Sequence, residues 1–472
     1  MVLTKTIVMK FGGTSVEDGA AFARVVEIVK AHDAARPVVV VSAMSGVTDA
    51  LLASVRLASD GDTDAAMRSL APHFDRHLRV ARSLGEQARA SIESLIEDAR
   101  REIAHRLQAL PLCQLMRPRL QDMVLSFGEY LSASLLTALL RDRGMSARYV
   151  DARHCIITNE EAGCAAPLLK ETEQQTRATL SPVLDAGDIP VVGGFIGATP
   201  KGITTTLGRG GSDYTAALVG AALRAREIQI WTDVNGVMTA DPRVVKAAHT
   251  VARLSYAEAS ELAYFGAKIL HPKTIQPAIK HDIPVRICNS RAPDEFGTLV
   301  CAEPRTEPRT VKAIAHKTGV TTVKVTSARF LGAYGFLRRI FEIFDRHRTV
   351  VDIVTTSEVS LSMSLDDVRA LPGIVNALKQ IGSVEVSKNR AVVCIVGEGL
   401  CGAPRITASV FNSIRNIPVT LISQGASSSN LTFVVDEECV KTVVTRLHQT
   451  FFENGIEEFQ EMIPLELLSI AD

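Results

Sequence analysis

Short apolar runs alternate with longer amphipathic segments in the first part of the chain. The runs lie at 6–13, 37–43, 189–197, 227–236 and 283–289. Most are continuously apolar and rich in β-branched residues, which is typical of strands buried on both faces. The helical patterns between them predict right-handed crossovers and an α/β fold, with a mostly parallel sheet sandwiched by helices.

A long helical pattern interrupts this alternation between residues 48 and 143. Apolar residues recur there with the period of an α-helix, among many arginines and glutamates, so we expect an inserted helical lobe. The segment 299–311 contains prolines and alternating charges, which favour a linker. We therefore predict a catalytic domain over 1–298 that includes the lobe.

The pattern changes after the linker, where the sequence is duplicated. Segment 320–363 aligns with segment 390–433, and each predicts a strand, a helix and two further strands. We expect two small α+β modules, over 312–386 and 387–454. Such a pair behind an α/β domain indicates regulation.

The composition of the chain argues against several classes of protein. Among 472 residues, 52 Lys and Arg balance 52 Asp and Glu, which argues against a nucleic-acid binder. No apolar run approaches the ~20 residues of a membrane span, and the N-terminus lacks a signal-peptide pattern. Eight scattered cysteines without a C-x-x-C pair predict reduced thiols and a cytoplasmic location.

A glycine-rich loop precedes an alanine-rich helical pattern in "TTTLGRGGSDYTAALVGAAL" (204–223). Backbone N–H groups of such a loop, together with a helix N-terminus, form an anion site. Gly210 and Gly211 permit close approach of a ligand, and Ser212 is a suitable N-cap. The alternative is a capped helix after a flexible loop, in which Asp213 only complements the helix dipole.

Three further segments carry candidate chemistry. Lys10 ends the first predicted strand beside Gly12 and Gly13, suited to a transferred phosphoryl group, although a solvated lysine at a tight turn is the alternative. The segment 231–243 lies at a strand's carboxyl end, where open α/β sheets bind ligands, but its turn residues also fit a surface hairpin. Lys268 has a helical context and could equally be a surface charge. We predict no metal cage.

Together, "KFGGTSV", "GRGGSDYTA", "WTDVNGV…DPR" and "FGAKILHP", in this order, resemble aspartate kinase. The segment "GFL…VVDIVTTSEVS" resembles the first of that family's ACT regulatory modules. The resemblance covers essentially the whole chain. It implies the amino-acid-kinase fold with two ACT modules of the βαββαβ, ferredoxin-like type behind it, the first of them completed by residues 455–472. It also implies a monofunctional enzyme without the homoserine dehydrogenase fused to some relatives.

The resemblance implies transfer of the γ-phosphoryl of ATP, with Mg²⁺, to the β-carboxylate of L-aspartate. An aspartate carboxylate is already ionised at pH 7, since its pKa is about 3.9, so no general base is needed. The implied phosphoryl-transfer residues are Lys10, Asp213, Lys268, Gly12 and Gly13, with glycine N–H donors also at Gly210 and Gly211. The implied aspartate-binding residues are Ser42, Thr48, Glu129, Arg209, Gly210, Gly211 and Ser212. The implied nucleotide-binding residues are Lys10, Thr232, Asp233, Met238, Arg243 and Lys268.

The resemblance also implies feedback inhibition by an amino acid at the ACT modules. The implied effector residues are Phe330, Gly335, Phe336, Leu337, Val351, Asp352, Ser357 and Glu358. Lysine-sensitive members carry methionine and serine where this chain has Phe330 and Ala333. Lysine is therefore the first choice of effector, followed by threonine or the two together. Pairing of ACT modules implies a homodimer or a dimer of dimers.

Two alternatives remain open at this point. A related kinase could act on another acid, such as glutamate or acetylglutamate, although the helical lobe and the ACT pair argue against this. A catalytically inactive amino-acid sensor is the other, and the intact Lys10, Arg209, Asp213 and Lys268 argue against it.

Overall fold

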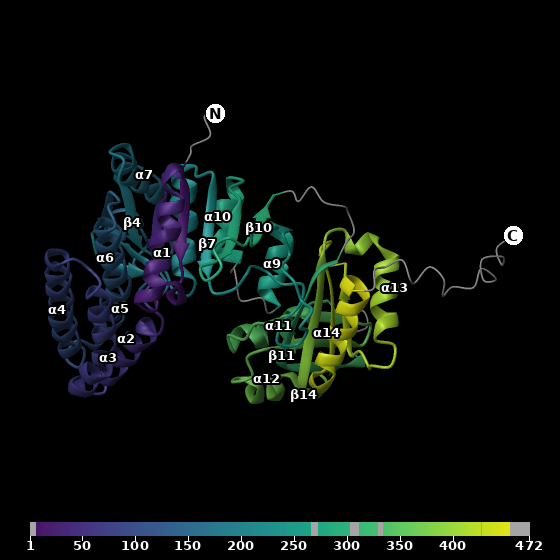
Figure 1. Cartoon of the computed structure of the whole chain (residues 1–472). Helices are drawn as coiled ribbons and strands as arrows, with labels where there is room; N and C mark the ends of the chain where they lie inside the picture. The colour runs from purple at the N-terminus through teal and green to yellow at the C-terminus, as the bar shows by residue number, and fades with distance from the viewer. Residues whose placement is uncertain (1–5, 266–271, 303–310, 329–333, 426, 454–472) are drawn as a thin grey trace. The chain divides into compact units, whose positions relative to one another are not determined.

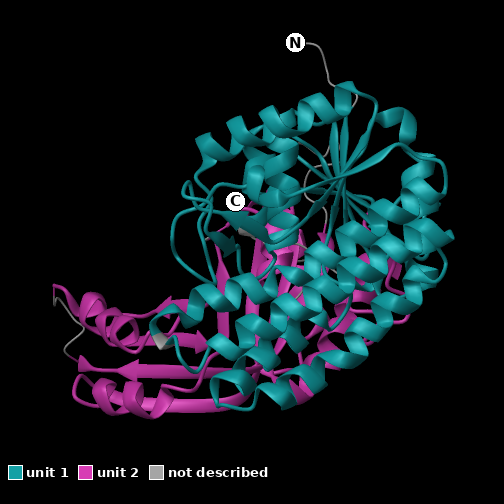
Figure 2. Cartoon of the chain, turned by 90° about the vertical axis from the view of Figure 1, so that its left-hand side faces the viewer, with its two compact units in different colours: residues 1–237, 252–256, 270–304 teal, residues 238–251, 257–269, 305–472 magenta. Residues whose placement is uncertain are grey.

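The computed structural model describes residues 6–265, 272–302, 311–328, 334–425 and 427–453 (Figure 1). The chain divides into two compact units (Figure 2). The first consists of 1–237, 252–256 and 270–304, and the second of 238–251, 257–269 and 305–472. Two short segments before residue 298 thus belong to the second unit. The domain boundaries given above stay predictions.

The first unit contains an eight-stranded, mostly parallel sheet in the order β3-β4-β2-β1-β7-β9-β10-β8. Strand β1 lies between β2 and β7, parallel to both, and β10 runs antiparallel to β9. The strands are β1 (Ile7–Phe11), β2 (Val38–Val41), β3 (Ala147–Val150), β4 (Ile189–Gly193), β7 (Glu227–Thr232), β8 (Arg253–Ser255), β9 (Val285–Asn289) and β10 (Thr298–Cys301). Each predicted apolar run contains one of them. A separate hairpin pairs β5 (Ile196–Ala198) with β6 (Thr204–Thr206).

Helices cover this sheet and form the inserted lobe. The lobe comprises α2 (Val47–Ser59), α3 (Thr63–Ala81), α4 (Glu86–Ala109), α5 (Arg117–Leu125) and α6 (Phe127–Asp142), which Figure 1 shows gathered together. The remaining helices are α1 (Gly19–Ala31), α7 (Leu169–Asp185), α8 (Gly211–Leu223), α9 (Tyr256–Tyr264), most of which belongs to the second unit, and α10 (Pro272–Lys280). The helical insertion expected from the sequence is therefore present.

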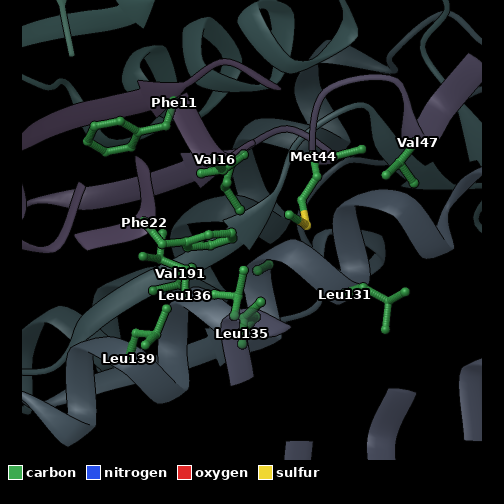
Figure 3. Packing of buried hydrophobic residues seen from close by; sticks show 14 of the residues in the cluster. Phe11, Val16, Phe22, Met44, Val47, Leu131, Leu135, Leu136, Leu139 and Val191 are labelled. Carbon is green, nitrogen blue, oxygen red and sulfur yellow. The ribbon is translucent and has the colours of Figure 1, made fainter. Parts of the chain in front are cut away.

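A hydrophobic core of the first unit extends from the lobe to the place where α6 and α1 pack on the sheet. Figure 3 shows Phe11, Phe22, Leu136 and Val191 among the side chains that meet there. The stretch Arg117–Asp142 is long and apolar enough to cross a membrane by length and composition, but 72% of its apolar window is buried inside the structure. It is a core element of the first unit.

The second unit contains one six-stranded sheet in the order β12-β13-β11-β14-β16-β15. Read inward from the two edges, the strand orders β12-β13-β11 and β15-β16-β14 correspond, as the duplication predicts. The two halves are joined by antiparallel pairing of β11 with β14. Its elements are β11 (Val311–Thr326), α11 (Phe336–Arg346), β12 (Val354–Thr356), β13 (Ser360–Leu365), α12 (Leu371–Leu378), β14 (Ser383–Gly397), α13 (Pro404–Ser413), β15 (Leu421–Gln424), β16 (Asn430–Asp436) and α14 (Val440–His448). Residues 455–472, expected to complete the first module, lie outside the described residues.

A buried histidine of the lobe predicts how stability depends on pH. His77 on α3 is 1% exposed, and one ring nitrogen lies 2.8 Å from the His73 carbonyl oxygen. Burial lowers its pKa to about 4. Between pH 6.5 and pH 4, the histidine is therefore protonated in the unfolded chain and neutral in the folded chain. The stabilisation is present above the usual pKa of 6.5 and is lost as pH falls toward 4.

Between pH 7 and pH 5, His77 should therefore remove about 2 kcal/mol from the free energy of unfolding. Urea unfolding measures this free energy at each pH. From pH 7 to pH 5, the free energy of unfolding of His77→Gln should fall by about 2 kcal/mol less than that of the wild type. The matched control is His105→Gln, at an exposed histidine of α4, which should keep the wild-type pH dependence. An unchanged pH dependence in His77→Gln would contradict the assignment.

Candidate active site

A lysine at the end of β1 and an aspartate in the first turn of α8 form an ion pair. Lys10 Nζ lies 2.6 Å from Asp213 Oδ1, and the two side chains are only 11% and 17% exposed. A carboxylate in the first turn of a helix is favoured by the helix dipole. A cation this far from water requires such a partner. The pair therefore holds a positive charge at the carboxyl end of the central strand.

The loop after β1 packs tightly against the ends of β7 and β2. Gly12 N–H donates to the Trp231 carbonyl at 3.0 Å, and a Cβ on Gly12 would lie 3.7 Å from Lys10 Nζ. A Cβ on Gly13 would lie 3.0 Å from the Ala43 carbonyl oxygen. Gly12 therefore keeps a side chain away from the lysine, and Gly13 allows the loop to approach the backbone after β2 closely.

The loop before α8 turns through two glycines with left-handed backbone. Gly208 and Gly210 have φ of 73° and 74°, and the exposed Arg209 lies between them. The helix begins at Gly211 with Gly210 as its N-cap. The prediction that Ser212 is the N-cap is wrong, because the left-handed turn at Gly210 already ends the loop and places Ser212 inside the first turn.

Two of the predicted backbone donors are engaged within the protein. Gly12 N–H binds the Trp231 carbonyl and Gly211 N–H binds the Gly208 carbonyl, both at 3.0 Å. These two bonds correct the expectation that Gly12, Gly13, Gly210 and Gly211 all offer their N–H groups to a ligand. The first turn of a helix has no intrahelical acceptors for its N–H groups, which makes Ser212 and Asp213 the better candidates.

Glu129, in the first turn of α6, is a buried carboxyl group. It is 3% exposed, and burial raises its pKa to about 8 against the opposing effects of a backbone hydrogen bond from Ala43 and the charge of Lys10. Its Oε2 atom has no hydrogen-bond partner among the described residues. A buried polar atom without a partner is costly and often marks a ligand site.

The turn at the end of β4 was not predicted to contribute to the site. A Cβ on Gly193 would lie 3.2 Å from Glu129 Cβ, and one on Gly194 would lie 2.6 Å from Ser212 Cβ. The next residue, Phe195, has φ of 68°, a strained conformation for a bulky residue. Two glycines directly after an apolar strand were the available signal. They allow α6 and α8 to approach this turn closely.

Ser42 and Thr48 lie near the start of α2. Ser42 N–H donates to the Phe11 carbonyl at 3.0 Å, and the Ser42 carbonyl accepts from Ser132 Oγ at 2.7 Å. Ser132 is on α6, three residues after Glu129. Ser42 is thus tied to both the β1 end and the Glu129 helix, and Thr48 is half-buried in the first turn of α2.

The proposed nucleotide residues are divided between the units. Thr232 ends β7, and its carbonyl accepts from Ser290 N and Oγ at 2.8 and 3.0 Å. The Thr232 hydroxyl donates to Asp233 at 3.2 Å. Met238 and Arg243 belong to the second unit, where the exposed Arg243 pairs with Asp241. Lys268 lies outside the described residues.

The predicted effector residues lie in the second unit. Gly335 is the N-cap of α11 with φ of 75°, Phe336 is buried and Leu337 is 47% exposed. Asp352 accepts a hydrogen bond from the Tyr264 hydroxyl of α9. Ser357 N–H donates to the Ser360 carbonyl at 2.8 Å, and the Ser357 hydroxyl accepts from Ser360 N–H at 3.1 Å. Val351 is half-buried and Glu358 is exposed, and Phe330 lies outside the described residues.

A cavity of about 790 Å³ lies on another side of α6, between the lobe and the β5–β6 hairpin. Its lining includes Phe127, Tyr130 and Arg153, and none of the predicted site residues. Arg153 donates to both carboxylate oxygens of Asp151. This cavity is therefore separate from the Lys10–Asp213 pair.

Comparison with known proteins matches residues 5–289 to the amino acid kinase family and residues 393–451 to an ACT domain. The chain is 38% identical to lysine-sensitive aspartokinase 3 of Escherichia coli K12, with 96% of this chain and 100% of that protein covered. It is 36% identical to the chloroplastic aspartokinase 2 of Arabidopsis thaliana, covering 95% of this chain and 84% of that protein.

Solved structures give the same result. E. coli aspartokinase III with lysine and aspartate, in its T-state, matches at 37% identity and a TM-score of 0.81. The same enzyme with aspartate and ADP, in its R-state, matches at 37% identity and a TM-score of 0.80. Each comparison covers 95% of this chain and 100% of the solved chain. This chain belongs to the amino acid kinase family and, within it, to the aspartokinases.

Proposed function

We propose that this protein is an aspartate kinase that converts ATP and L-aspartate to ADP and 4-phospho-L-aspartate. The observation that carries the proposal is the Lys10–Asp213 ion pair at the N-terminus of α8, in the same unit as the buried, partly unsatisfied Glu129. This arrangement supplies positive charge for a phosphoryl group and negative charge for an ammonium group. Both are needed to align an amino acid with ATP.

Phosphoryl transfer requires alignment and charge neutralisation rather than a base. An oxygen of the aspartate β-carboxylate attacks the γ-phosphorus, and the bond to the departing ADP oxygen breaks, with no proton released. Charge on the transferring group is stabilised by preorganised cations and N–H donors. Lys10 supplies the cation in our proposal, and Asp213 fixes its position. The N–H groups of Ser212 and Asp213 add the donors.

Glu129 and Arg209 recognise the two ends of the aspartate backbone in this proposal. The raised pKa of Glu129, about 8, leaves it mostly protonated near pH 7 when no cation adjoins it. An incoming ammonium group favours the ionised carboxylate and can take the place of its proton. The planar guanidinium of Arg209 suits the α-carboxylate, which it can bind in two-pronged geometry.

For the nucleotide we propose Lys10, Thr232, Asp233, Met238, Arg243 and Lys268. The polar side chains of Thr232 and Asp233 at the end of β7 support a polar ligand at that edge of the sheet. Mg²⁺, when bound, neutralises phosphate charge and is held mainly by ATP oxygens and water.

Four finer points are also proposals. Feedback control acts through the ACT modules, with lysine as first choice and threonine, or both together, as second. The protein assembles as a homodimer or a dimer of dimers through these modules. It serves the aspartate-derived pathway to lysine, threonine and methionine. Its location is cytoplasmic, which the eight free cysteines, all in the described part of the chain, support.

A coupled assay of ADP formation separates this proposal from its alternatives. ADP should form with L-aspartate and ATP together, and far more slowly with glutamate or acetylglutamate. Activity with glutamate or acetylglutamate only would identify a different amino-acid kinase. A folded protein without activity on any of these acids would identify a sensor.

Lys10→Ala should lower kcat by roughly 10²–10⁴-fold, the scale for loss of one preorganised contact to a transition state. Steady-state kinetics at saturating aspartate and ATP measure this. Lys201→Ala, at an exposed lysine paired with Glu160, is the matched control and should keep the wild-type kcat. A normal kcat in folded Lys10→Ala would remove Lys10 from the site.

Arg209→Lys should raise the KM for aspartate by about tenfold or more, because lysine keeps the charge but loses the two-pronged geometry. The KM for ATP should change much less. Both are obtained by varying one substrate at saturation of the other. If the KM for ATP rises while that for aspartate stays constant, Arg209 belongs to the nucleotide.

Asp352→Ala should raise the effector concentration for half-inhibition roughly 10–100-fold, the scale for a hydrogen bond to a charged group. In the structure Asp352 accepts from Tyr264, and an effector ammonium would compete for the same oxygen. Lysine and threonine, separately and together, are titrated against the wild type and the variant. Asp367→Ala, at an exposed aspartate that pairs with Arg369, is the control. Equal inhibition of wild type and Asp352→Ala would exclude Asp352 from the effector site.

A further inference from the structure

A fully buried carboxylate lies in α5, outside the residues assigned above. Asp122 is 0% exposed and accepts hydrogen bonds from Gly163 and Thr206. Gly163 N–H lies 2.9 and 3.1 Å from its two oxygens, and the Thr206 hydroxyl donates to Oδ1 at 2.8 Å. Burial raises its pKa, against the effect of these bonds. A carboxylate so far from water is retained only where its acceptor capacity is used.

Both partners of Asp122 lie at the base of the loop that carries Arg209. Thr206 is the last residue of β6, three residues before Arg209. Its carbonyl accepts from Ala165 N–H at 2.9 Å. A Cβ on Gly208 would lie 3.4 Å from both the Gly163 carbonyl oxygen and Cys164 Sγ. The loop therefore rests on segment 163–165, and Asp122 joins that segment to β6.

The helical segment that contains Asp122 also carries Glu129. Helix α5 ends at Leu125 and α6 begins at Phe127, so only Ser126 separates them. Its hydroxyl donates to the Met123 carbonyl at 2.8 Å. Asp122 and Glu129 are thus seven positions apart on two consecutive helices with buried faces. One helical segment presents Glu129 and holds the base of the Arg209 loop.

We propose that Asp122 is a positioning residue that fixes the Arg209 loop relative to Glu129, and thereby the spacing between the carboxylate- and ammonium-binding parts of the aspartate site. This inference rests on the proposed roles of Arg209 and Glu129. Asp122 touches no substrate and acts through Thr206 and Gly163. The distance between Arg209 and Glu129 then favours an amino acid whose side-chain carboxylate lies next to Lys10 when its α-carboxylate and α-ammonium groups are bound.

The hydrogen-bond donors around residue 122 explain why an aspartate is needed at this position. Its neighbours present a hydroxyl and a backbone N–H, which are donors. An asparagine has one acceptor oxygen, and its NH₂ group would face a donor. Loss of the bridge leaves β6 attached through its pairing with β5 and through the bond from Ala165 N–H to the Thr206 carbonyl. The fold is therefore kept, while the base of the loop loses its side-chain anchor.

The test compares Asp122→Asn and Thr206→Val with Thr205→Val. Thr205 is the matched control, because it is the adjacent residue on β6, is 2% exposed, and bonds instead to the Thr158 hydroxyl at 2.7 Å. Asp122→Asn and Thr206→Val should each raise the KM and the calorimetric Kd for aspartate by about tenfold. The KM for ATP should stay within about twofold, since the hydrogen bonds of Asp122 run to Gly163 and Thr206, which are not among the residues proposed for the nucleotide. Thr206→Ser, which keeps the hydroxyl, should restore the wild-type KM for aspartate.

Three results would overturn the inference. One is a folded Thr206→Val with the wild-type KM for aspartate. Another is an equal rise in Thr205→Val, which would show general weakening of the strand. The third is a parallel rise in the KM for ATP and fall in kcat, which would show a structural role only. If Asp122→Asn does not fold, the Thr206 series decides alone.

Arg209→Lys, measured in parallel, separates this inference from the proposed function. If Arg209→Lys leaves the KM for aspartate unchanged, the assignment of Arg209 fails and the proposal for Asp122 fails with it. If Arg209→Lys raises that KM but the Asp122 and Thr206 variants do not, only the positioning role is excluded.

Discussion

The ion pair between Lys10 and Asp213 is the contact on which the rest of the first unit's site depends. It joins the end of the central strand β1 to the first turn of α8 across 2.6 Å, with little exposure of either side chain. Lysine is a strongly hydrated cation, so its transfer from water requires a fixed counter-charge. The helix dipole favours the carboxylate at that position. A phosphoryl group arriving beside the pair therefore meets a cation already oriented for it.

Close packing at glycines brings the remaining groups to this pair. Gly193 lies against Glu129, where a Cβ would make a tight contact of 3.2 Å, and Gly194 lies against Ser212, where a Cβ at 2.6 Å has no room. The turn after β4 is thereby in contact with both α6 and α8. The strained backbone of Phe195 directly follows. Such strain persists only where the surrounding structure determines the conformation, as the neighbouring helices and the β5–β6 hairpin do here.

The second unit shows how a duplicated sequence can form a single sheet. Each half has the order of a short βαββ unit, and the long strands β11 and β14 pair to make six continuous strands. Separate hydrophobic clusters lie under the two halves. Segments 238–251 and 257–269, which precede the duplication in sequence, also belong to this unit. The Tyr264–Asp352 hydrogen bond is one contact between these parts.

The sequence by itself determined the parallel strands, the helical lobe, the duplication and the family, because buried strands, helical periodicity and glycine turns leave local signals. It also singled out Lys10, Asp213 and Glu129 as candidate site residues through their motifs. It could not show that Gly12 and Gly211 use their N–H groups internally, that Gly210 rather than Ser212 caps α8, or that Asp122 joins two distant loops. Hydrogen bonds between residues 41 and 84 positions apart leave no periodic trace. Only the tertiary structure decided them, because burial removes water as the competing partner and leaves each polar group to the neighbour that the fold supplies.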